Sequence, residues 1–225
     1  MIMGKRPGRG ARLLLCAACA GLLSGHALPV RAAEPAYVYT YEFGEICDFT
    51  YTESHGVGIY SDDQAKTELF TGFLDKLPEK LLKQFSGQVF FFAAKPVNRY
   101  VRYDTGDPGF KGLGSLYNFG VLEGLTGMYD TNYNQLDVQS GLPDDAFLMT
   151  VAHEMGHRYK VLTGGSLPDG CIGTVQVLTN MLSPLHNGSH ISGENEAYAE
   201  AFAFYCLHND ELKAALPNVW GMFGE

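Results

Sequence analysis

At Pro143 the chain changes its pattern of apolar residues, and no other property of the sequence limits the possible folds as strongly. Before this point, aromatic and β-branched residues form short runs of the kind that predict β-strands. After it, apolar residues recur at the three- and four-residue spacing of helices. Strands followed by helices predict an α+β domain. The expected strands are Tyr37–Gly44, Gln88–Ala94, Leu116–Val121, Thr126–Tyr129 and Gln135–Val138.

One helix is expected among the strands. Ser61 is its predicted N-cap, and Pro78 bends or restarts it. Its buried face is predicted from apolar residues one turn apart. The residues of that face are Ala65, Leu69, Phe73 and Leu77. After the change of pattern, the expected helices are Asp144 to about Gly164, Ile172–Leu182, Glu194–His208 and Asp210–Leu216.

The first 33 residues have the pattern of a secretory signal peptide. Basic residues precede a small and apolar run, Leu13–Leu23, and Ala32 and Ala33 offer a cleavage site. An uncleaved membrane anchor is the competing interpretation, but the run is short for a transmembrane helix. We therefore expect a secreted or extracytoplasmic protein, with the periplasm and the cell envelope as further destinations. The expected organisation is a signal peptide over residues 1–33 and a single domain over residues 34–225.

The net charge of the chain limits the kinds of molecule that it can bind. Without residues 1–33 the chain has 11 Lys and Arg against 25 Asp and Glu, a formal net charge of −14. Such a surface repels phosphate backbones, so we expect no nucleic-acid partner. No later stretch is apolar enough to span a bilayer, so we expect no stable membrane insertion after signal cleavage.

Cysteine use is sparse for an exported protein. Cys47, Cys171 and Cys206 remain after the presumed signal peptide, so at most one disulfide forms within the chain. Cys171 and Cys206 can pair in an oxidising compartment. A buried free thiol at Cys206 is an equally good interpretation. In either case a packed core must supply most of the stability.

The string His153-Glu154-Met155-Gly156-His157 carries the most chemical information. Histidines four residues apart lie on one helical face, so both imidazoles can reach one ion. Glu154 is rotated by about 100° from His153, close enough to hold a water molecule without binding the metal. The alternative is a helix that carries two surface histidines by chance. We favour a zinc site with Glu154 as general base.

A third ligand is expected downstream. Catalytic zinc sites use three protein ligands and keep the fourth position for water. Glu196 and Glu200 are one turn apart on a stretch too rich in Ala and Phe for a surface helix. Two carboxylates are costly to bury unless a cation or donor meets them. We predict Glu196 as the ligand and Glu200 as acceptor of a hydrogen bond from a ligand histidine; the alternative places both carboxylates in solvent.

With these residues the chain resembles the gluzincin metallopeptidases, which combine a His-Glu-x-x-His helix with a later Glu-x-x-x-Glu-Ala-Phe. The stretch AYAEAFAFYCLHNDELKAALPNVWGMF is similar to the C-terminal helices of the anthrax-lethal-factor-like group, which includes small secreted Pro-Pro endopeptidases. The resemblance is specific over Phe147–His157 and Glu194–Phe223. It is looser over Gly112–Asp130, and nothing before Lys111 matches.

This resemblance implies a zincin-like fold, in which a small twisted mixed sheet packs on the active-site helix and is followed by a helical half. It implies Zn²⁺ on His153, His157 and Glu196, with Glu154 as base and Glu200 in support. It also implies an edge strand within Val121–Tyr129, to which an extended peptide or protein substrate adds by backbone pairing.

The chain departs from the family at one position. The family usually has a tyrosine seven residues before the glutamate ligand, where it stabilises the oxyanion, and this chain has Ser189 there. His190 and His186 are close by and offer imidazole donors instead, or neither does. We take His190 as the candidate catalytic donor.

The function predicted from these observations is that of a secreted zinc-dependent endopeptidase, with Pro-rich sites as candidate substrates. In the predicted mechanism, metal-activated water attacks the peptide bond while a glutamate acts as general base. The main alternative is a non-catalytic secreted protein that uses a zinc scaffold to bind a peptide; Glu154 argues against it, because a purely structural site needs no base. A toxin-like effector shares the chemistry and differs in destination.

Overall fold

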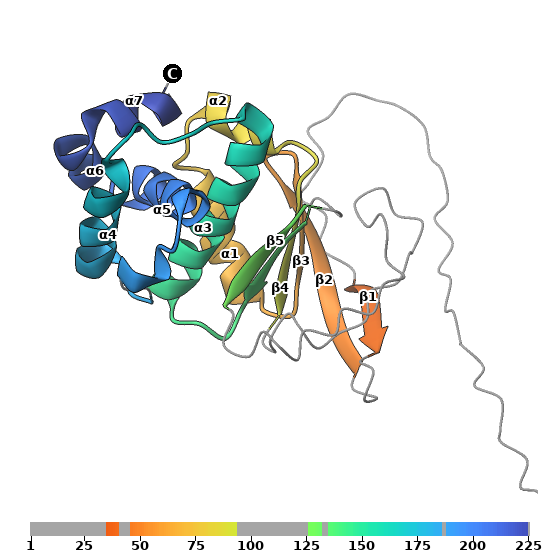
Figure 1. Cartoon of the computed structure of the whole chain (residues 1–225). Coiled ribbons are helices and arrows are strands. Elements are labelled where there is room, and N and C mark those ends of the chain that lie inside the picture. Colours follow the sequence, from red (N-terminus) through yellow and green to blue (C-terminus); the bar gives the residue numbers. More distant parts are fainter. Residues whose placement is uncertain (1–34, 41–45, 94–125, 132–134, 186–187, 225) are drawn as a thin grey trace, which may run out of the picture. The chain divides into compact units, whose positions relative to one another are not determined.

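The computed structural model describes residues 35–40, 46–93, 126–131, 135–185 and 188–224, all of which belong to one compact unit, Ala33–Glu225 (Figure 1). The predicted signal peptide over residues 1–33 and the expected strand Leu116–Val121 lie outside the described residues. The description below concerns the compact unit alone.

A six-stranded mixed sheet occupies the N-terminal part of the described chain, with strand order β1-β2-β3-β4-β6-β5. The pairs β3–β4 and β4–β6 are parallel, and the other neighbours are antiparallel. Three expected strands are confirmed as β4, β5 and β6 within one or two residues, and β1 covers the first part of Tyr37–Gly44. The strands are β1 (Pro35–Thr40), β2 (Ile46–Ser54), β3 (Val57–Ser61), β4 (Val89–Ala93), β5 (Gly127–Asp130) and β6 (Gln135–Gln139).

The hairpin of β2 and β3 is absent from the sequence prediction. Its two-residue turn is His55-Gly56, with φ of 51° and 76°, between the paired residues Ser54 and Val57. Positive φ at both positions is the requirement of the type I′ hairpin turn, whose usual sequence is Asn-Gly or Asp-Gly. Histidine at the first position made the turn hard to recognise.

Helices make up the rest of the described chain, so the α+β prediction is confirmed. The four expected helices after Pro143 are all present, with ends shifted by at most two residues, and α7 is additional. They are α1 (Gln64–Leu74), α2 (Glu79–Leu82), η1 (Lys83–Phe85), α3 (Asp144–Thr163), α4 (Cys171–Leu182), η3 (Gly188–His190), α5 (Glu194–Leu207), α6 (Asn209–Ala215) and α7 (Pro217–Gly224).

One prediction about α1 is wrong and another is confirmed only in part. The N-cap is Asp63, whose side chain accepts a hydrogen bond from the Lys66 backbone at 3.1 Å, whereas the Ser61 hydroxyl bonds to Asp63 instead. A carboxylate two residues later simply outcompetes the serine for the free N–H groups. Of the predicted buried face, Phe73 and Leu77 are buried, Leu69 is partly buried and Ala65 is exposed. The buried residues of the helix are Lys66, Thr67, Phe70, Phe73 and Leu74.

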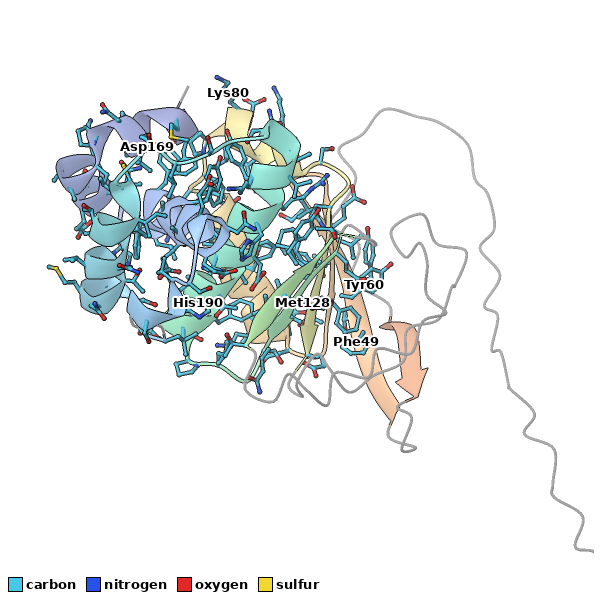
Figure 2. The ribbon with its side chains drawn as sticks, in the orientation of Figure 1. Phe49, Tyr60, Lys80, Met128, Asp169 and His190 are labelled. Carbon is cyan, nitrogen blue, oxygen red and sulfur yellow. The ribbon has the colours of Figure 1, made fainter. Side chains whose placement is uncertain are left out.

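Both faces of the central strand β4 are covered by aromatic rings. Phe90 and Phe92 pack against Phe70 of α1, with ring centroids 4.6 and 5.2 Å apart. Phe91 points the other way and lies 4.5 Å from Phe49. Figure 2 shows Phe49 and Tyr60 on the side of the sheet away from the helices. Because β4 is buried on both faces, its sequence is an uninterrupted run of apolar residues.

Helix α3 lies between the sheet and α5 (Figure 1). It contacts β5 and β6 on one side and α5 on the other, and α1 also packs on it. Gly156 makes the closest approach: a Cβ at this position would lie 2.6 Å from Cα of Ala199. Two small residues thus bring the backbones of α3 and α5 together at the level of the His-Glu-x-x-His string.

Cys171 and Cys206 are both free thiols in the described part of the chain, so no disulfide joins α4 to α5 there. Burial raises the pKa of the Cys206 thiol, which agrees with an inert cysteine packed against the core. The side chain of Cys47 lies outside the described residues. Within the described ranges, no helix combines the length and apolar character needed to cross a membrane.

Candidate metal centre

The His-Glu-x-x-His string lies in the middle of α3, on the face turned toward α5 and the sheet. His153 and Glu154 are buried, with 3% and 7% of their surface exposed, and 22% of the His157 side chain is exposed. The helix ends at Gly164, which adopts the left-handed conformation with φ of 63°. The helix therefore continues for nearly two turns beyond His157. Residues of these turns line the cleft that is described below.

Helix α5 brings the two glutamates to the same place. Glu196 lies in its first turn and is 30% exposed, whereas Glu200, one turn further, is fully buried. Oε2 of Glu196 is 3.2 Å from Nε2 of His153 and 3.6 Å from Nε2 of His157. The two histidine Nε2 atoms are 3.1 Å apart. The side chains of His153, His157 and Glu196 therefore lie together in the structure.

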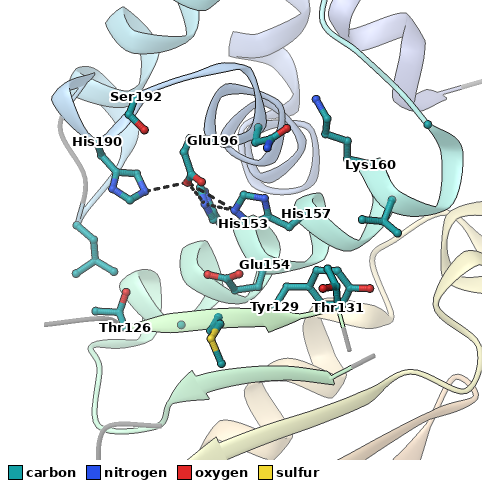
Figure 3. A pocket seen from close by; sticks show the side chains of 16 residues that line it. Thr126, Tyr129, Thr131, His153, Glu154, His157, Lys160, His190, Ser192 and Glu196 are labelled. Atoms are coloured by element: carbon teal, nitrogen blue, oxygen red, sulfur yellow. Dashed lines mark hydrogen bonds and ion pairs between the residues drawn. The ribbon is translucent and has the colours of Figure 1, made fainter. Parts of the chain in front are cut away.

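These three side chains form a compact set of donor atoms. One ligand atom from each lies within 4.8 Å of the other two (Figure 3). Histidine and carboxylate groups gathered so closely are able to hold a divalent cation between them. Two of the three groups come from α3 and one from α5, so the packing of these helices creates the set.

Glu200 holds His153 from behind. Its Oε2 is 2.8 Å from Nδ1 of His153, and both side chains are almost or entirely inaccessible to solvent. An ionised carboxylate can only accept this hydrogen bond, so Nδ1 of His153 carries a proton and Nε2 is the nitrogen that faces Glu196 and His157. This is the contact predicted for Glu200 from the sequence.

The four groups also shift one another's proton affinity. Burial disfavours the charged form of His153, but hydrogen bonds to Glu196 and Glu200, and the negative charges nearby, outweigh it and raise the pKa of His153 to about 10. The same hydrogen bonds from His153 and His157 hold the pKa of Glu196 far below its usual range. In the absence of another cation, a proton on His153 therefore balances the buried carboxylates.

Glu154 points away from this set and toward the edge of the sheet. Gly127 of β5 leaves room for it, because a Cβ there would be 3.1 Å from Cγ of Glu154 and 2.5 Å from Cγ2 of Thr150. Burial raises the pKa of Glu154, although positive charge on His153 and His157 and a hydrogen bond from the Tyr129 backbone oppose the shift. A raised pKa makes a carboxylate a stronger base, which helps it to take a proton.

His190 approaches Oε2 of Glu196 from a direction different from those of His153 and His157. It lies on η3, its Nε2 is 3.4 Å from Oε2 of Glu196, and 37% of its side chain is exposed. Its ring centroid is 5.6 Å from that of His153 (Figure 3). The neighbouring Ser189 is exposed, and His186, the other sequence candidate, lies outside the described residues.

A cleft of about 1040 Å³ opens over these residues. One wall is β5, the last of the described strands in the sheet order, and the opposite wall is formed by η3 and the start of α5. Val161 and Leu185 also line the cleft and are 56% and 36% exposed. The side chains of His153, Glu154, His157, His190 and Glu196 all line this cleft.

Sequence reasoning did not identify Gly127 or the backbone of Tyr129 as neighbours of Glu154. A glycine inside an expected strand is a general indication that something approaches the backbone closely, and Gly127 gives that indication. The ion pair of Lys160 with Glu194, 2.9 Å long, was also missed, because the partners belong to different helices. This ion pair engages the ammonium group of Lys160, which lines the cleft.

Comparison of the chain with models of known protein families finds no match, and neither does comparison with curated proteins.

Proposed function

We propose that this protein is a zinc-dependent endopeptidase with a zincin-like fold, exported by the signal peptide predicted over residues 1–33. The observation that carries the proposal is the convergence of His153, His157 and Glu196 beside a separate buried carboxylate, Glu154, in one open cleft. A site that served only to stabilise the fold would gain nothing from a second carboxylate aimed at the cleft.

The donor set fits zinc. Two imidazoles and one carboxylate are a common set of protein ligands in catalytic zinc sites, which leave a further position to water or substrate. The hydrogen bond from Nδ1 of His153 to Glu200 is the kind of support that metal-binding histidines usually have. A zinc ion held by these residues would supply Lewis acidity, which lowers the pKa of water and polarises a carbonyl group.

Glu154 would act as the general base and then as the acid. Its carboxylate borders the cleft next to the proposed ligands, so it can take a proton from an attacking water and deliver it to the leaving amine. The position of Gly127 and the Tyr129 backbone against it restricts its movement. Both proton transfers require the ionised and the neutral form to be accessible, which the raised pKa favours.

His190 is the proposed donor to the carbonyl oxygen. Its imidazole lies beside the ligand set, with Nε2 3.4 Å from Oε2 of Glu196, and a donor at the place where negative charge develops typically contributes on the order of 100-fold to the rate. It would replace the tyrosine that the resembled family has at the position of Ser189.

The proposed substrate is an extended peptide or a protein segment. Strand β5 forms one wall of the cleft, and an extended chain can add to a sheet edge through backbone hydrogen bonds. Pro-rich sequences are candidates on the strength of the resemblance to Pro-Pro endopeptidases alone.

The decisive experiment separates metal binding from turnover. Residues 34–225 are incubated with a mixed peptide library, with and without a zinc chelator, and cleavage sites are read by mass spectrometry while metal content is measured. We expect chelator-sensitive cleavage, Glu154→Ala protein that keeps about one zinc but loses at least about 1000-fold in rate, and His153→Ala protein without zinc. Glu211→Ala, on the exposed side of α6, is the matched control and should behave as wild type.

Two results would count against the proposal. Turnover by the Glu154→Ala protein at the wild-type rate would show that Glu154 is not the general base. Tight zinc binding without cleavage of any peptide would favour the non-catalytic peptide-binding alternative.

A further inference from the structure

The segment that carries His190 is anchored on α4. The backbone N–H of Gly188 donates to Oδ1 of Asn180 at 2.8 Å, and the side chain of Gln176 donates to the carbonyl of Ile191 at 3.2 Å. Ile191 is buried, with 3% of its surface exposed. Thus η3 is held on both sides of His190 by contacts that do not involve the histidine's own side chain.

Gly188 allows η3 to lie unusually close to α4. A Cβ at this position would be 2.7 Å from the carbonyl oxygen of Gln176 and 2.8 Å from Nδ2 of Asn180. Real Cβ atoms do not approach other atoms so closely, so only glycine fits without displacing the segment. The amide of Asn180 therefore meets the segment both as hydrogen-bond acceptor and as the surface against which Gly188 rests.

The side chain of His190 extends from this anchored backbone. It is 37% exposed, and its Nε2 lies 3.4 Å from Oε2 of Glu196. A shift of the η3 backbone would therefore move the imidazole relative to Glu196. Catalytic groups must be held to within roughly 0.5 Å, and a displacement of about 1 Å can cost on the order of 100-fold in rate.

We infer that Asn180 is a positioning residue for His190: by fixing Gly188, it directs the imidazole toward the carbonyl oxygen of a substrate bound beside Glu196. The inference rests on the proposed function, in which His190 donates to that oxygen. Asn180 touches neither the substrate nor the proposed metal ligands in this arrangement, and it lies on the helix that borders η3. Gln176 has the same task at the other end of the segment.

The test compares Asn180→Ala with Asn209→Ala. Both asparagines accept a hydrogen bond through Oδ1, in Asn209 from the indole of Trp220 at 3.0 Å, but Asn209 lies at the start of α6. We expect Asn180→Ala to lower kcat by about 10-fold with KM and zinc affinity unchanged, and Asn209→Ala to leave kcat unchanged. Asn180→Asp keeps an oxygen for the Gly188 N–H and should retain most of the activity.

A double-variant cycle separates positioning from a general loss of stability. His190→Ala should lower kcat by about 100-fold, and adding Asn180→Ala to it should produce no further loss, because the group that Asn180 positions is already gone. If the two losses multiply, or if Asn180→Ala alone leaves kcat unchanged, the inference is wrong.

A measurement without turnover keeps this inference distinct from the proposed function. In zinc-loaded protein, the imidazole nitrogens of His190 can be followed by ¹H–¹⁵N NMR. Asn180→Ala should shift and broaden the His190 signals, whereas Asn209→Ala should leave them in place. Unchanged His190 signals in Asn180→Ala would overturn the inference even if the protein cleaves peptides. Absence of cleavage with the expected NMR change would instead overturn the proposed function.

Discussion

The helix pair α3–α5 and the α4–η3 segment both contribute side chains to the cleft, but they hold them by different means. On the first side, His153 and Glu200 are buried, and close packing at Gly156 brings their helices together. On the second, His190 is 37% exposed, and hydrogen bonds between α4 and the backbone on both sides of it hold its segment. His153 and its support Glu200 are part of the core, and Glu196 and His157 are partly exposed at 30% and 22%, whereas the proposed carbonyl donor belongs to a surface segment.

This difference separates the stability of the proposed metal centre from the placement of the proposed carbonyl donor. Groups built into the core cannot be changed without changing the stability of the fold, so metal affinity and folding are expected to vary together. A group on an anchored surface segment can be altered with little effect on stability. The predictions below use this separation, beginning with the largest expected effect.

The packing of α3 on α5 can be broken with a single methyl group. In Gly156→Ala the new Cβ would lie 2.6 Å from the backbone of Ala199, and we expect the free energy of unfolding to fall by about 3 kcal/mol. Gly173→Ala is the matched control, because it lies inside α4 with nothing within 4 Å of its Cβ. It should raise the unfolding free energy by about 0.5 to 1 kcal/mol. Urea denaturation measures both; equal effects would mean that the helices can separate without cost.

The charge balance in the core predicts how pH affects the metal-free protein. The pKa of His153 is raised to about 10, so its contribution to stability is fully present below about 6.5 and is lost as the pH rises toward 10. The pKa of Glu196 is lowered, so its contribution is present above about 4.5 and is lost at lower pH. Metal-free protein should therefore be most stable between these limits.

Chemical denaturation at pH 6 and pH 9.5 checks this prediction. We expect a loss of a few kcal/mol between the two values in the metal-free protein, a smaller loss with zinc, and little change in His153→Ala. An unchanged unfolding free energy across this range would show that the carboxylates near His153 are balanced in another way.

The support of His153 by Glu200 should appear mainly in metal affinity. Glu200→Gln keeps the shape of the side chain but removes the charge, and we expect zinc affinity to fall by about 10- to 100-fold. Glu194→Gln, on the same helix, faces Lys160 at the surface and should change the affinity by less than about 2-fold. Competition with a fluorescent chelator measures both constants. Equal zinc affinities for the two variants would show that Glu200 does not support the metal site.

The site was easier to predict from the sequence than the fold around it. Histidines at a spacing of four have only one common face on a helix, and the glutamates on an apolar helix required a partner, so their meeting followed from local rules. The hairpin turn His55-Gly56 was not predicted, because histidine is an unusual first residue for this type of turn. The N-cap of α1 failed for a similar reason, since Ser61 and Asp63 compete for the same N–H groups.

Other contacts between distant elements were not predicted from the sequence. The approach of Gly127 to Glu154 and of Gly188 to α4 depends on tertiary packing, which no periodicity reports. Sequence arguments left His190 and His186 as alternatives. The geometry brings His190 to 3.4 Å from Glu196, while His186 lies outside the described residues. Its role as donor stays a prediction for the variants above.

His153 and Glu196 are 43 residues apart in the sequence, and α4 and η3 lie between them. An ion held by both would close this stretch of chain into a loop. In the chain-entropy description of cross-links, closing a loop of that length is worth about 4 kcal/mol at 25 °C, much as a disulfide would be. For a protein whose described cysteines are unpaired, a chelator would then act on the fold as a reducing agent acts on a disulfide-bonded domain.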